Sequence, residues 1–183
     1  MAEIKKVGVL GCGLMGSGIA QVAAAAGYTT VVRDVSDAVM AKGKAGIAKS
    51  LDKFVEKGKL AAADRDATLG RMSYVTDVAA LKDCDIVIEA VTEDLELKND
   101  LWKQLDALCP AHTLFASNTS SLTIAAMASA TARADRFVGL HFFNPVPLMQ
   151  LVEVVRTVTT STATFDRALA FGKSLGKEAV AAK

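Results

Sequence analysis

The sequence predicts an α/β fold, a doubly wound and mostly parallel sheet with helices on both faces. Short apolar runs of strand length alternate along the chain with segments of helical periodicity. Strands that alternate with helices are joined by right-handed crossovers, which make neighbouring strands parallel and cover both faces of the sheet. The 183 residues are 51% hydrophobic, enough to bury a core, and no Pro-, Gly- or Ser-rich linker divides them. We therefore expect one continuous domain over residues 1–183.

The first strand and the first helix are joined by a glycine-rich turn. The apolar run Val7–Leu10 is followed by the pattern GxGxxG, and an Ala-rich helical stretch covers Leu14–Ala26. The three glycines of the pattern are Gly11, Gly13 and Gly16. The first lets the chain leave the strand sharply, the second lets backbone approach a pyrophosphate, and the third lets the helix pack against the sheet. The unpaired N–H groups at the helix N-terminus then stabilise a phosphate anion.

An acidic residue follows the second strand where a dinucleotide site requires one. The strand is expected at Thr29–Arg33, and Asp34 lies 18 residues after Gly16, close to the roughly 20 expected for a ribose-binding acid. A carboxylate binds both ribose hydroxyls and repels a 2′-phosphate, so the site favours NAD over NADP. Arg33 could attract a 2′-phosphate, but we expect it on the opposite side of the strand. The pattern predicts a Rossmann-type NAD-binding domain; the alternative is a glycine turn beside an ordinary surface aspartate.

A projecting helical arm is expected after this acid, over residues 36–70. Its helix runs from Ser36, as the N-cap, to Lys57, and is longer than a crossover needs. The apolar positions expected to face the core are Val39, Met40, Ile47, Leu51, Phe54 and Val55. The lysines of the arm are Lys42, Lys44, Lys49, Lys53, Lys57 and Lys59. They form either an ordinary solvated face or a basic surface for an anionic ligand.

The remaining elements continue the alternation. The expected strands are Asp85–Val91, Thr113–Ser117, Phe137–Phe143 and Leu148–Arg156, and the expected helices are Asp94–Leu108, Leu122–Ser129 and Ser161–Leu175, which leads into Ala179–Ala182. Ligands gather at the carboxyl ends of parallel strands, so one rim of the sheet should carry the functional groups. The segments at that rim are Gly11–Gly16, Asp34, Glu89–Glu93, Ser117–Ser121 and His141–Asn144.

Composition argues against several classes of function. A net charge of +1 and an aromatic content of 5% argue against nucleic-acid binding. No apolar run approaches the roughly 18 residues of a membrane span. Three widely spaced cysteines do not suggest a disulfide framework, which indicates a reducing compartment, with the cytoplasm as the default. The segment Cys109–His112 lacks a second pair of ligands, so no metal site is expected.

A histidine at the functional rim can be paired with a glutamate by counting. If Phe137–Phe143 and Leu148–Arg156 form an antiparallel pair centred on Pro147, Glu153 lies opposite His141. The carboxylate would fix the tautomer of the imidazole and stabilise its charged form. A neutral imidazole is suited to accept a hydroxyl proton during hydride transfer. The alternative is a structural histidine that bonds to a neighbouring carbonyl group.

Polar residues near this histidine have competing interpretations. Ser120 could donate to a substrate carbonyl oxygen, or it could belong to a helix cap. Asn144 could anchor the histidine segment, or it could stabilise the turn before Pro145. We expect Ser121 to cap the helix that starts at Leu122.

The segments GCGLMGSGIAQVAAAAGY, VVRD, EAVTED, FASNTSSL and GLHFFNPVPLMQLVEVV together resemble the NAD-binding domain of the L-3-hydroxyacyl-CoA dehydrogenases, which include bacterial 3-hydroxybutyryl-CoA dehydrogenases. The resemblance implies reversible, NAD-dependent oxidation of an L-3-hydroxyacyl-CoA to the 3-ketoacyl-CoA. The implied catalytic residues are His141, Glu153, Ser120 and Asn144. The implied cofactor contacts are Gly11, Gly13, Leu14, Met15, Gly16, Asp34, Glu93, Lys98 and Asn118. The implied coenzyme A contacts are Ser50 and Lys57.

In the resembling family a helical C-terminal domain follows and completes the cleft, whereas this chain stops at Lys183. We therefore expect NAD binding, but slow turnover of acyl-CoA unless a partner domain or a homo-oligomer supplies the missing wall. Two alternatives stay open. One is a non-catalytic NAD-binding module, and the other is a dehydrogenase of free hydroxy acids or sugar acids.

Overall fold

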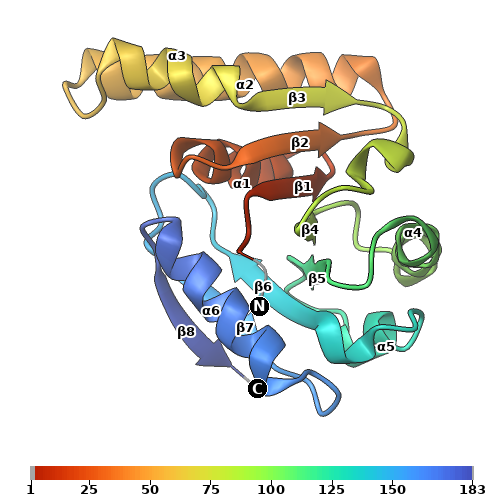
Figure 1. The fold of residues 1–183 in the computed structure, drawn as a ribbon. Helices are drawn as coiled ribbons and strands as arrows, with labels where there is room; N and C mark the ends of the chain where they lie inside the picture. The colour runs from red at the N-terminus through yellow and green to blue at the C-terminus, as the bar shows by residue number, and fades with distance from the viewer. Residues whose placement is uncertain (1–2, 183) are drawn as a thin grey trace.

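The computed structural model describes residues 3–182, which form one eight-stranded sheet with helices on both faces (Figure 1). The strands are β1 (Lys6–Leu10), β2 (Thr29–Arg33), β3 (Met72–Val75), β4 (Ile86–Glu89), β5 (Leu114–Ser117), β6 (Phe137–Phe142), β7 (Leu151–Val155) and β8 (Glu178–Ala182). Their order in the sheet is β3-β2-β1-β4-β5-β6-β7-β8. Every neighbouring pair in this sheet is parallel except β6 and β7. The predicted Rossmann-type fold is confirmed.

The helices divide between the two faces of the sheet. They are α1 (Leu14–Ala25), α2 (Asp37–Glu56), α3 (Ala62–Gly70), α4 (Leu95–Leu108), α5 (Ile124–Ala128) and α6 (Thr162–Ser174), with short 3-10 turns at Val78–Leu81 and Ala134–Arg136. One apolar cluster joins α1 and α6 to the sheet through residues such as Ile19 and Phe171. A second joins α4 and α5 to the sheet through Trp102 and Met127. The two clusters explain why the strands are apolar on both faces.

The arm consists of α2 and α3, which pack together and extend past the sheet at the top left of Figure 1. Ser36 is the N-cap, as expected, and its Oγ accepts from Val39 N at 3.4 Å. The apolar stripe buries Met40, Ile47 and Leu51. The expectation that Val39 also faces the core is wrong, because its side chain is 38% exposed and lines a cleft beside Asp34.

One strand and several boundaries differ from those expected. The short edge strand β3 was not expected at all. Strand β7 begins at Leu151 rather than Leu148, because a turn occupies the residues after Pro145, whose carbonyl oxygen accepts from the main-chain N–H groups of Leu148 and Met149. Helix α5 begins at Ile124 rather than Leu122. The register between β6 and β7 is unaffected.

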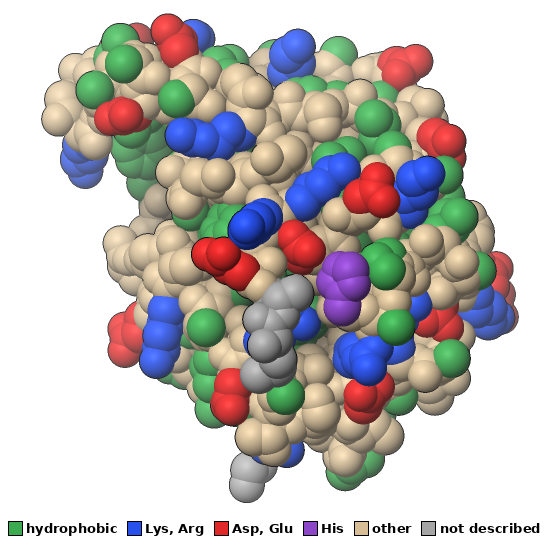
Figure 2. Space-filling view, in the orientation of Figure 1, with side chains coloured by type: hydrophobic (Ala, Val, Ile, Leu, Met, Phe, Trp, Pro, Cys, Tyr) green, Lys and Arg blue, Asp and Glu red, His purple; other side chains and the backbone are tan. Residues whose placement is uncertain are grey.

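The surface carries charges of both signs. On the face drawn in Figure 2, acidic and basic side chains are interspersed, as the net charge of +1 suggests. None of the helices within residues 3–182 is both long enough and apolar enough to cross a membrane.

Candidate functional site

The glycine turn lies at the switch point of the sheet, where β1 has β2 on one side and β4 on the other. Gly11 has φ +95°, and a Cβ there would lie 2.6 Å from Ala90 O. A Cβ at Gly16 would overlap Gly11 O, so only glycine lets α1 begin this close to β1. A Cβ at Gly13 would meet nothing within 4 Å, which leaves open space in front of the α1 N-terminus. This backbone fits a pyrophosphate, because the N–H groups at the helix end face that space.

Asp34 lies beside this turn and is already oriented by it. Its Oδ2 accepts from Cys12 N at 2.7 Å, so the carboxylate is held at the mouth of a cleft of about 500 Å³. Val35 and Leu97 are exposed apolar side chains in the same cleft. A carboxylate beside apolar walls fits the ribose and adenine of a dinucleotide. Arg33 lines this cleft too, so the expectation that it points away is wrong; its Nε donates to Thr76 O at 3.0 Å.

His141 and Glu153 face each other across β6 and β7, in the predicted register. His141 Nδ1 and Glu153 Oε2 are 2.8 Å apart, and the Phe143 ring lies 4.5 Å from the imidazole, centre to centre. The carboxylate therefore takes the place that a main-chain carbonyl would occupy in a purely structural histidine. Because Glu153 engages Nδ1, proton exchange with a ligand falls to Nε2.

The pocket in front of the imidazole brings together three of the four expected catalytic residues and three of the expected cofactor contacts. It has a volume of about 260 Å³ and is lined by Met15, Glu93, Asn118, Ser120, His141, Phe142, Phe143 and Asn144. Asn118 is buried at the end of β5, and its Oδ1 accepts from Phe142 N at 2.8 Å, which ties the histidine strand to its neighbour. Leu14, the remaining residue of the glycine turn, is 73% exposed at the start of α1.

Lys98 differs from its neighbours in being buried, with 1% of its side chain exposed. Its Nζ lies 3.2 Å from Glu93 Oε1 and 3.0 Å from Glu89 Oε1. Glu93 thus reaches the pocket itself, whereas the Lys98 ammonium lies beneath it.

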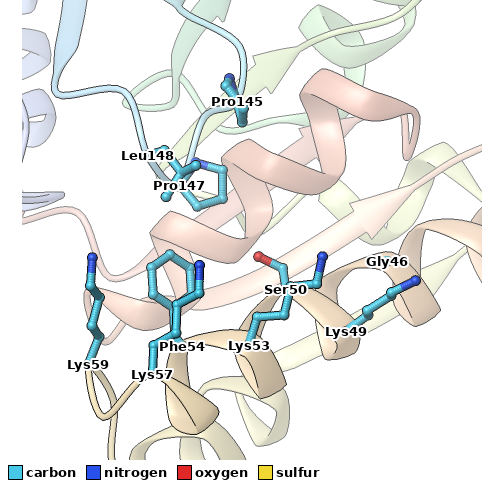
Figure 3. Close-up of a pocket in the computed structure, with 10 residues that line it drawn as sticks. All are labelled: Gly46, Lys49, Ser50, Lys53, Phe54, Lys57, Lys59, Pro145, Pro147 and Leu148. Carbon is cyan, nitrogen blue, oxygen red and sulfur yellow. The ribbon is translucent and has the colours of Figure 1, made fainter.

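A second groove, of about 380 Å³, lies between the arm and the segment that follows the histidine strand (Figure 3). One wall is α2 with its C-cap residue Lys57; α2 itself contributes Ser50, Lys49 and Lys53, so both expected residues, Ser50 and Lys57, lie on this wall. The other wall is the proline loop, residues 143–150, through Pro145, Pro147 and Leu148. Figure 3 shows lysine side chains from α2 and the turn after it spread along the groove. The arrangement suits a long anionic ligand that ends near His141.

Ser121 does not cap a helix, because α5 begins at Ile124 with Thr123 as its N-cap residue. Thr119 Oγ1 accepts from Leu122 N at 3.0 Å, a bond that stabilises the bend before α5 and does not cap the helix. Sequence reasoning placed Thr119, Phe143 and Glu89 only within segments expected at the rim and gave none of them a role of its own. A charged residue inside the apolar run Ile86–Glu89 was the available signal for the last of these.

The second histidine, Cys84 and Cys109 lie away from these pockets, whereas Cys12 belongs to the glycine turn. His112 Nε2 is 3.7 Å from Asp85 Oδ1 at the opposite edge of the sheet, as expected. Cys12, Cys84 and Cys109 are unpaired and buried. Burial raises the pKa of the Cys109 thiol to about 11. Within residues 3–182, no cluster of three or more His, Cys, Asp or Glu side chains could hold a metal ion.

Comparison with known proteins adds an independent observation. Residues 6–183 match the family model described as 3-hydroxyacyl-CoA dehydrogenase, NAD binding domain. The chain is 51% identical to the mitochondrial hydroxyacyl-coenzyme A dehydrogenase of Rattus norvegicus, over 98% of the chain and 59% of that protein. It is 48% identical to a probable 3-hydroxybutyryl-CoA dehydrogenase of Deinococcus radiodurans, over 94% of the chain and 62% of that protein.

Among solved structures, (S)-3-hydroxybutyryl-CoA dehydrogenase from Ralstonia eutropha superposes with a TM-score of 0.95 at 46% identity. The superposition covers 98% of this chain and 63% of that one. The chain thus spans about three-fifths of the length of these relatives.

Proposed function

Because the chain belongs to the 3-hydroxyacyl-CoA dehydrogenase family, through the NAD-binding domain of that family, we propose that it oxidises the 3-hydroxyl of an L-3-hydroxyacyl-CoA to a ketone, reversibly. The chemistry that NAD supplies when bound is acceptance of a hydride. We assign its pyrophosphate to the turn at Gly11, Gly13 and Gly16, and its adenosine ribose to Asp34. The open backbone at Gly13 and the preoriented carboxylate support this assignment.

In this proposal His141 is the general base. Its Nε2 accepts the proton of the substrate hydroxyl while the hydrogen on the same carbon leaves as hydride, and it returns the proton in the reverse direction. The Glu153 carboxylate accepts a hydrogen bond from the Nδ1–H of His141 and stabilises the imidazolium that forms, since Nδ1 and Oε2 are 2.8 Å apart. Ser120 and Asn144, which line the same pocket, are assigned to the substrate carbonyl and to the wall beside it.

The groove on α2 is proposed to bind the coenzyme A portion of the substrate. Coenzyme A carries a phosphate and a diphosphate on a long thin chain, and the lysines along the groove are suited to those charges. Ser50 and Lys57 are the assigned contacts. Pro145 lines the groove and its chain neighbour Asn144 lines the catalytic pocket, so the two cavities adjoin the same segment. This proximity favours an acyl-CoA over a free hydroxy acid.

Full turnover is proposed to need protein surface beyond residues 3–182, either a helical domain or a partner chain. Ser120 and Asn144 are both exposed, so the pocket as described stands open to water. Nicotinamide chemistry is favoured when water is excluded from the site. Good NAD binding without turnover of any acyl-CoA, even with a helical partner domain added, would instead favour a non-catalytic module. A cytoplasmic location stays a prediction.

The observation that carries the proposal is the His141–Glu153 pair in a pocket next to the dinucleotide turn. The test follows NADH absorbance with acetoacetyl-CoA for the native protein, His141→Gln and His112→Gln. The first substitution should lower kcat roughly 10³-fold, and the second, at the opposite edge of the sheet, should not change it. Equal rates for native protein and His141→Gln would refute the assignment. Free coenzyme A should inhibit the reaction competitively with the substrate, whereas an enzyme for free hydroxy acids should not be inhibited by it.

A further inference from the structure

Glu89 ends β4 and is completely buried, with no exposed surface. Its carboxylate is surrounded by donors. Oε1 accepts from Val91 N at 2.8 Å and lies 3.0 Å from Lys98 Nζ, and Oε2 accepts from Ser117 Oγ at 2.6 Å. A buried carboxylate is stable only when such partners replace water, and here the donors come from three separate elements.

These contacts continue to the pocket surface and close into a ring. Lys98 Nζ bonds to Glu93 Oε1 at 3.2 Å, and Thr119 Oγ1 donates to Glu93 Oε2 at 2.7 Å. Thr119 N donates back to Ser117 Oγ at 3.4 Å. We call this set the carboxylate ring: Glu89, Lys98, Glu93, Thr119 and Ser117. Both oxygens of Glu93 are held by protein donors, so its position at the pocket is determined from beneath.

The carboxylate ring contains two carboxylates and one ammonium group, so its formal charge is −1. Lys98 is shared between Glu89 and Glu93 and cannot neutralise both. Glu93 is the outermost member, with 46% of its side chain exposed, and it lines the pocket that contains His141. The uncompensated negative charge is therefore presented to the catalytic pocket.

We propose that Glu89 is a positioning residue that, by sharing Lys98, keeps the pocket anionic and makes it bind oxidised cofactor in preference to reduced cofactor. The inference rests on the proposed function. The carbon that loses hydride carries the hydroxyl that His141 deprotonates, so the nicotinamide ring must share the pocket with Glu93. That ring is cationic when oxidised and neutral when reduced, and a nearby anion stabilises only the cation.

Glu89→Gln tests this by removing one negative charge while keeping the size and shape of the side chain. The glutamine Oε1 can accept from Val91 N and Lys98 Nζ as the carboxylate does, whereas its Nε2 can only donate to Ser117 Oγ, which reverses that bond. With the charge of Glu89 removed, Lys98 fully compensates Glu93. Dissociation constants for NADH, from its fluorescence, and for NAD⁺, by competition, give the preference of each variant.

The preference for NAD⁺, measured as the ratio of the two dissociation constants, should fall roughly tenfold in Glu93→Gln and roughly three- to tenfold in Glu89→Gln. Ser117→Ala removes a neutral donor from the same ring and should leave the ratio unchanged. Glu93 is at the surface of the pocket, so Glu93→Gln keeps the proposal testable if Glu89→Gln does not fold.

Equal weakening of both cofactor forms in Glu89→Gln would mean that the residue is merely structural and would overturn the proposal, as would an unchanged ratio in Glu93→Gln. A native protein that binds neither cofactor form would refute the proposed function instead. The two failures are therefore distinguishable.

Discussion

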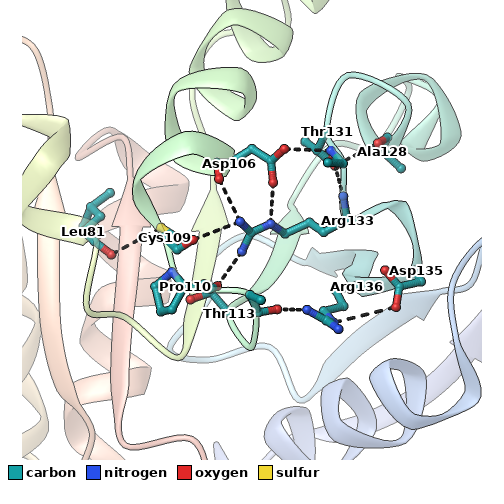
Figure 4. A network of polar contacts seen from close by, with 12 residues as sticks. Leu81, Asp106, Cys109, Pro110, Thr113, Ala128, Thr131, Arg133, Asp135 and Arg136 are labelled. Atoms are coloured by element: carbon teal, nitrogen blue, oxygen red, sulfur yellow. Dashed lines mark hydrogen bonds and ion pairs between the residues drawn. The ribbon is translucent and has the colours of Figure 1, made fainter.

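Arg133→Met tests how strongly one buried guanidinium fastens the carboxyl end of α4 to the segment before β6. The side chain is 9% exposed, and all three of its nitrogens are engaged (Figure 4). Nε lies 2.5 Å from Asp106 Oδ1, Nη1 donates to Pro110 O at 2.7 Å, and Nη2 donates to Asp106 O and Cys109 O at 2.8 and 3.0 Å. Asp106 O and Cys109 O lie at the end of α4, where a helix leaves its carbonyl groups without intrahelical partners, and Pro110 O lies just beyond it.

The expected loss follows from which partners remain unsatisfied. Removing one member of a buried ion pair costs about 3–5 kcal/mol, and unsatisfied carbonyl groups add to this. Two features reduce the effect. Asp106 keeps the N–H of Ala132 at 2.7 Å, and a methionine keeps much of the stacking on Phe115, whose ring lies 4.6 Å from the guanidinium carbon. We therefore expect Arg133→Met to lower the free energy of unfolding by about 3 kcal/mol.

The assay is thermal unfolding by calorimetry, with urea titration as the second measurement. For a chain of this size about 3 kcal/mol corresponds to a fall in Tm of roughly 6–12 °C. Arg136→Met is the matched control: Arg136 contacts Ala111 O and Asp135, and its side chain is 39% exposed, so the change should stay within about 1 kcal/mol. A Tm within about 2 °C of native for Arg133→Met, or equal losses for both variants, would refute the reasoning.

Three more predictions use other features of the fold. Burial raises the pKa of the Cys84 thiol to about 12, so its contribution to stability is present below about pH 9 and is lost as the pH rises toward 12. Between pH 8 and pH 10.5, the free energy of unfolding measured with urea should therefore fall more for the native protein than for Cys84→Ala. Lys177→Met removes the ammonium that donates at 2.6 Å to two main-chain carbonyls of the proline loop, which forms one wall of the proposed coenzyme A groove. The substitution should weaken coenzyme A binding roughly tenfold in calorimetry and leave NAD binding unchanged. Gly16→Ala forces a Cβ onto Gly11 O and should weaken NADH binding roughly 10- to 100-fold by fluorescence, whereas Gly70→Ala, where a Cβ meets nothing within 4 Å, should not.

The parts of the molecule that could be predicted from sequence are those fixed by local patterns. The glycine turn and Asp34 are close in sequence, so their spacing already fixes their relative positions. The pairing of His141 with Glu153 follows from a hairpin, in which a single point of symmetry determines every partner. The pairing stays centred on Pro147 although β6 ends one residue earlier and β7 starts three residues later than expected, because shorter strands leave the register of the remaining pairs unchanged.

The errors arose where a longer-range contact overrides a local signal. Ser121 has the right residue type for a cap, but the chain first makes a bend, in which Thr119 Oγ1 accepts from the N–H groups of Ser121 and Leu122, and α5 starts only at Ile124. Val39 has the spacing of a core residue, yet the first turn of α2 overhangs the dinucleotide cleft. The strand β3 has only four residues at the edge of the sheet, and none of them is fully buried, so its apolar pattern is weak.

The carboxylate ring is neither a correct prediction nor an error. The sequence contains a signal for it, but the signal appears only when a helix and a strand are considered together. Lys98 precedes Leu101, Trp102 and Leu105 by three, four and seven residues, which is the spacing of one helix face. All three of these side chains are buried, so a lysine in that row must be buried as well. A buried ammonium requires a carboxylate, and Glu89 is the acid that closes the apolar strand packed beneath this helix. The pair could thus have been predicted from the rule that a charge on an apolar stripe implies a partner on the facing element. The exposure of Glu93, by contrast, depends on how the loop after β4 leaves the sheet, which no periodicity encodes.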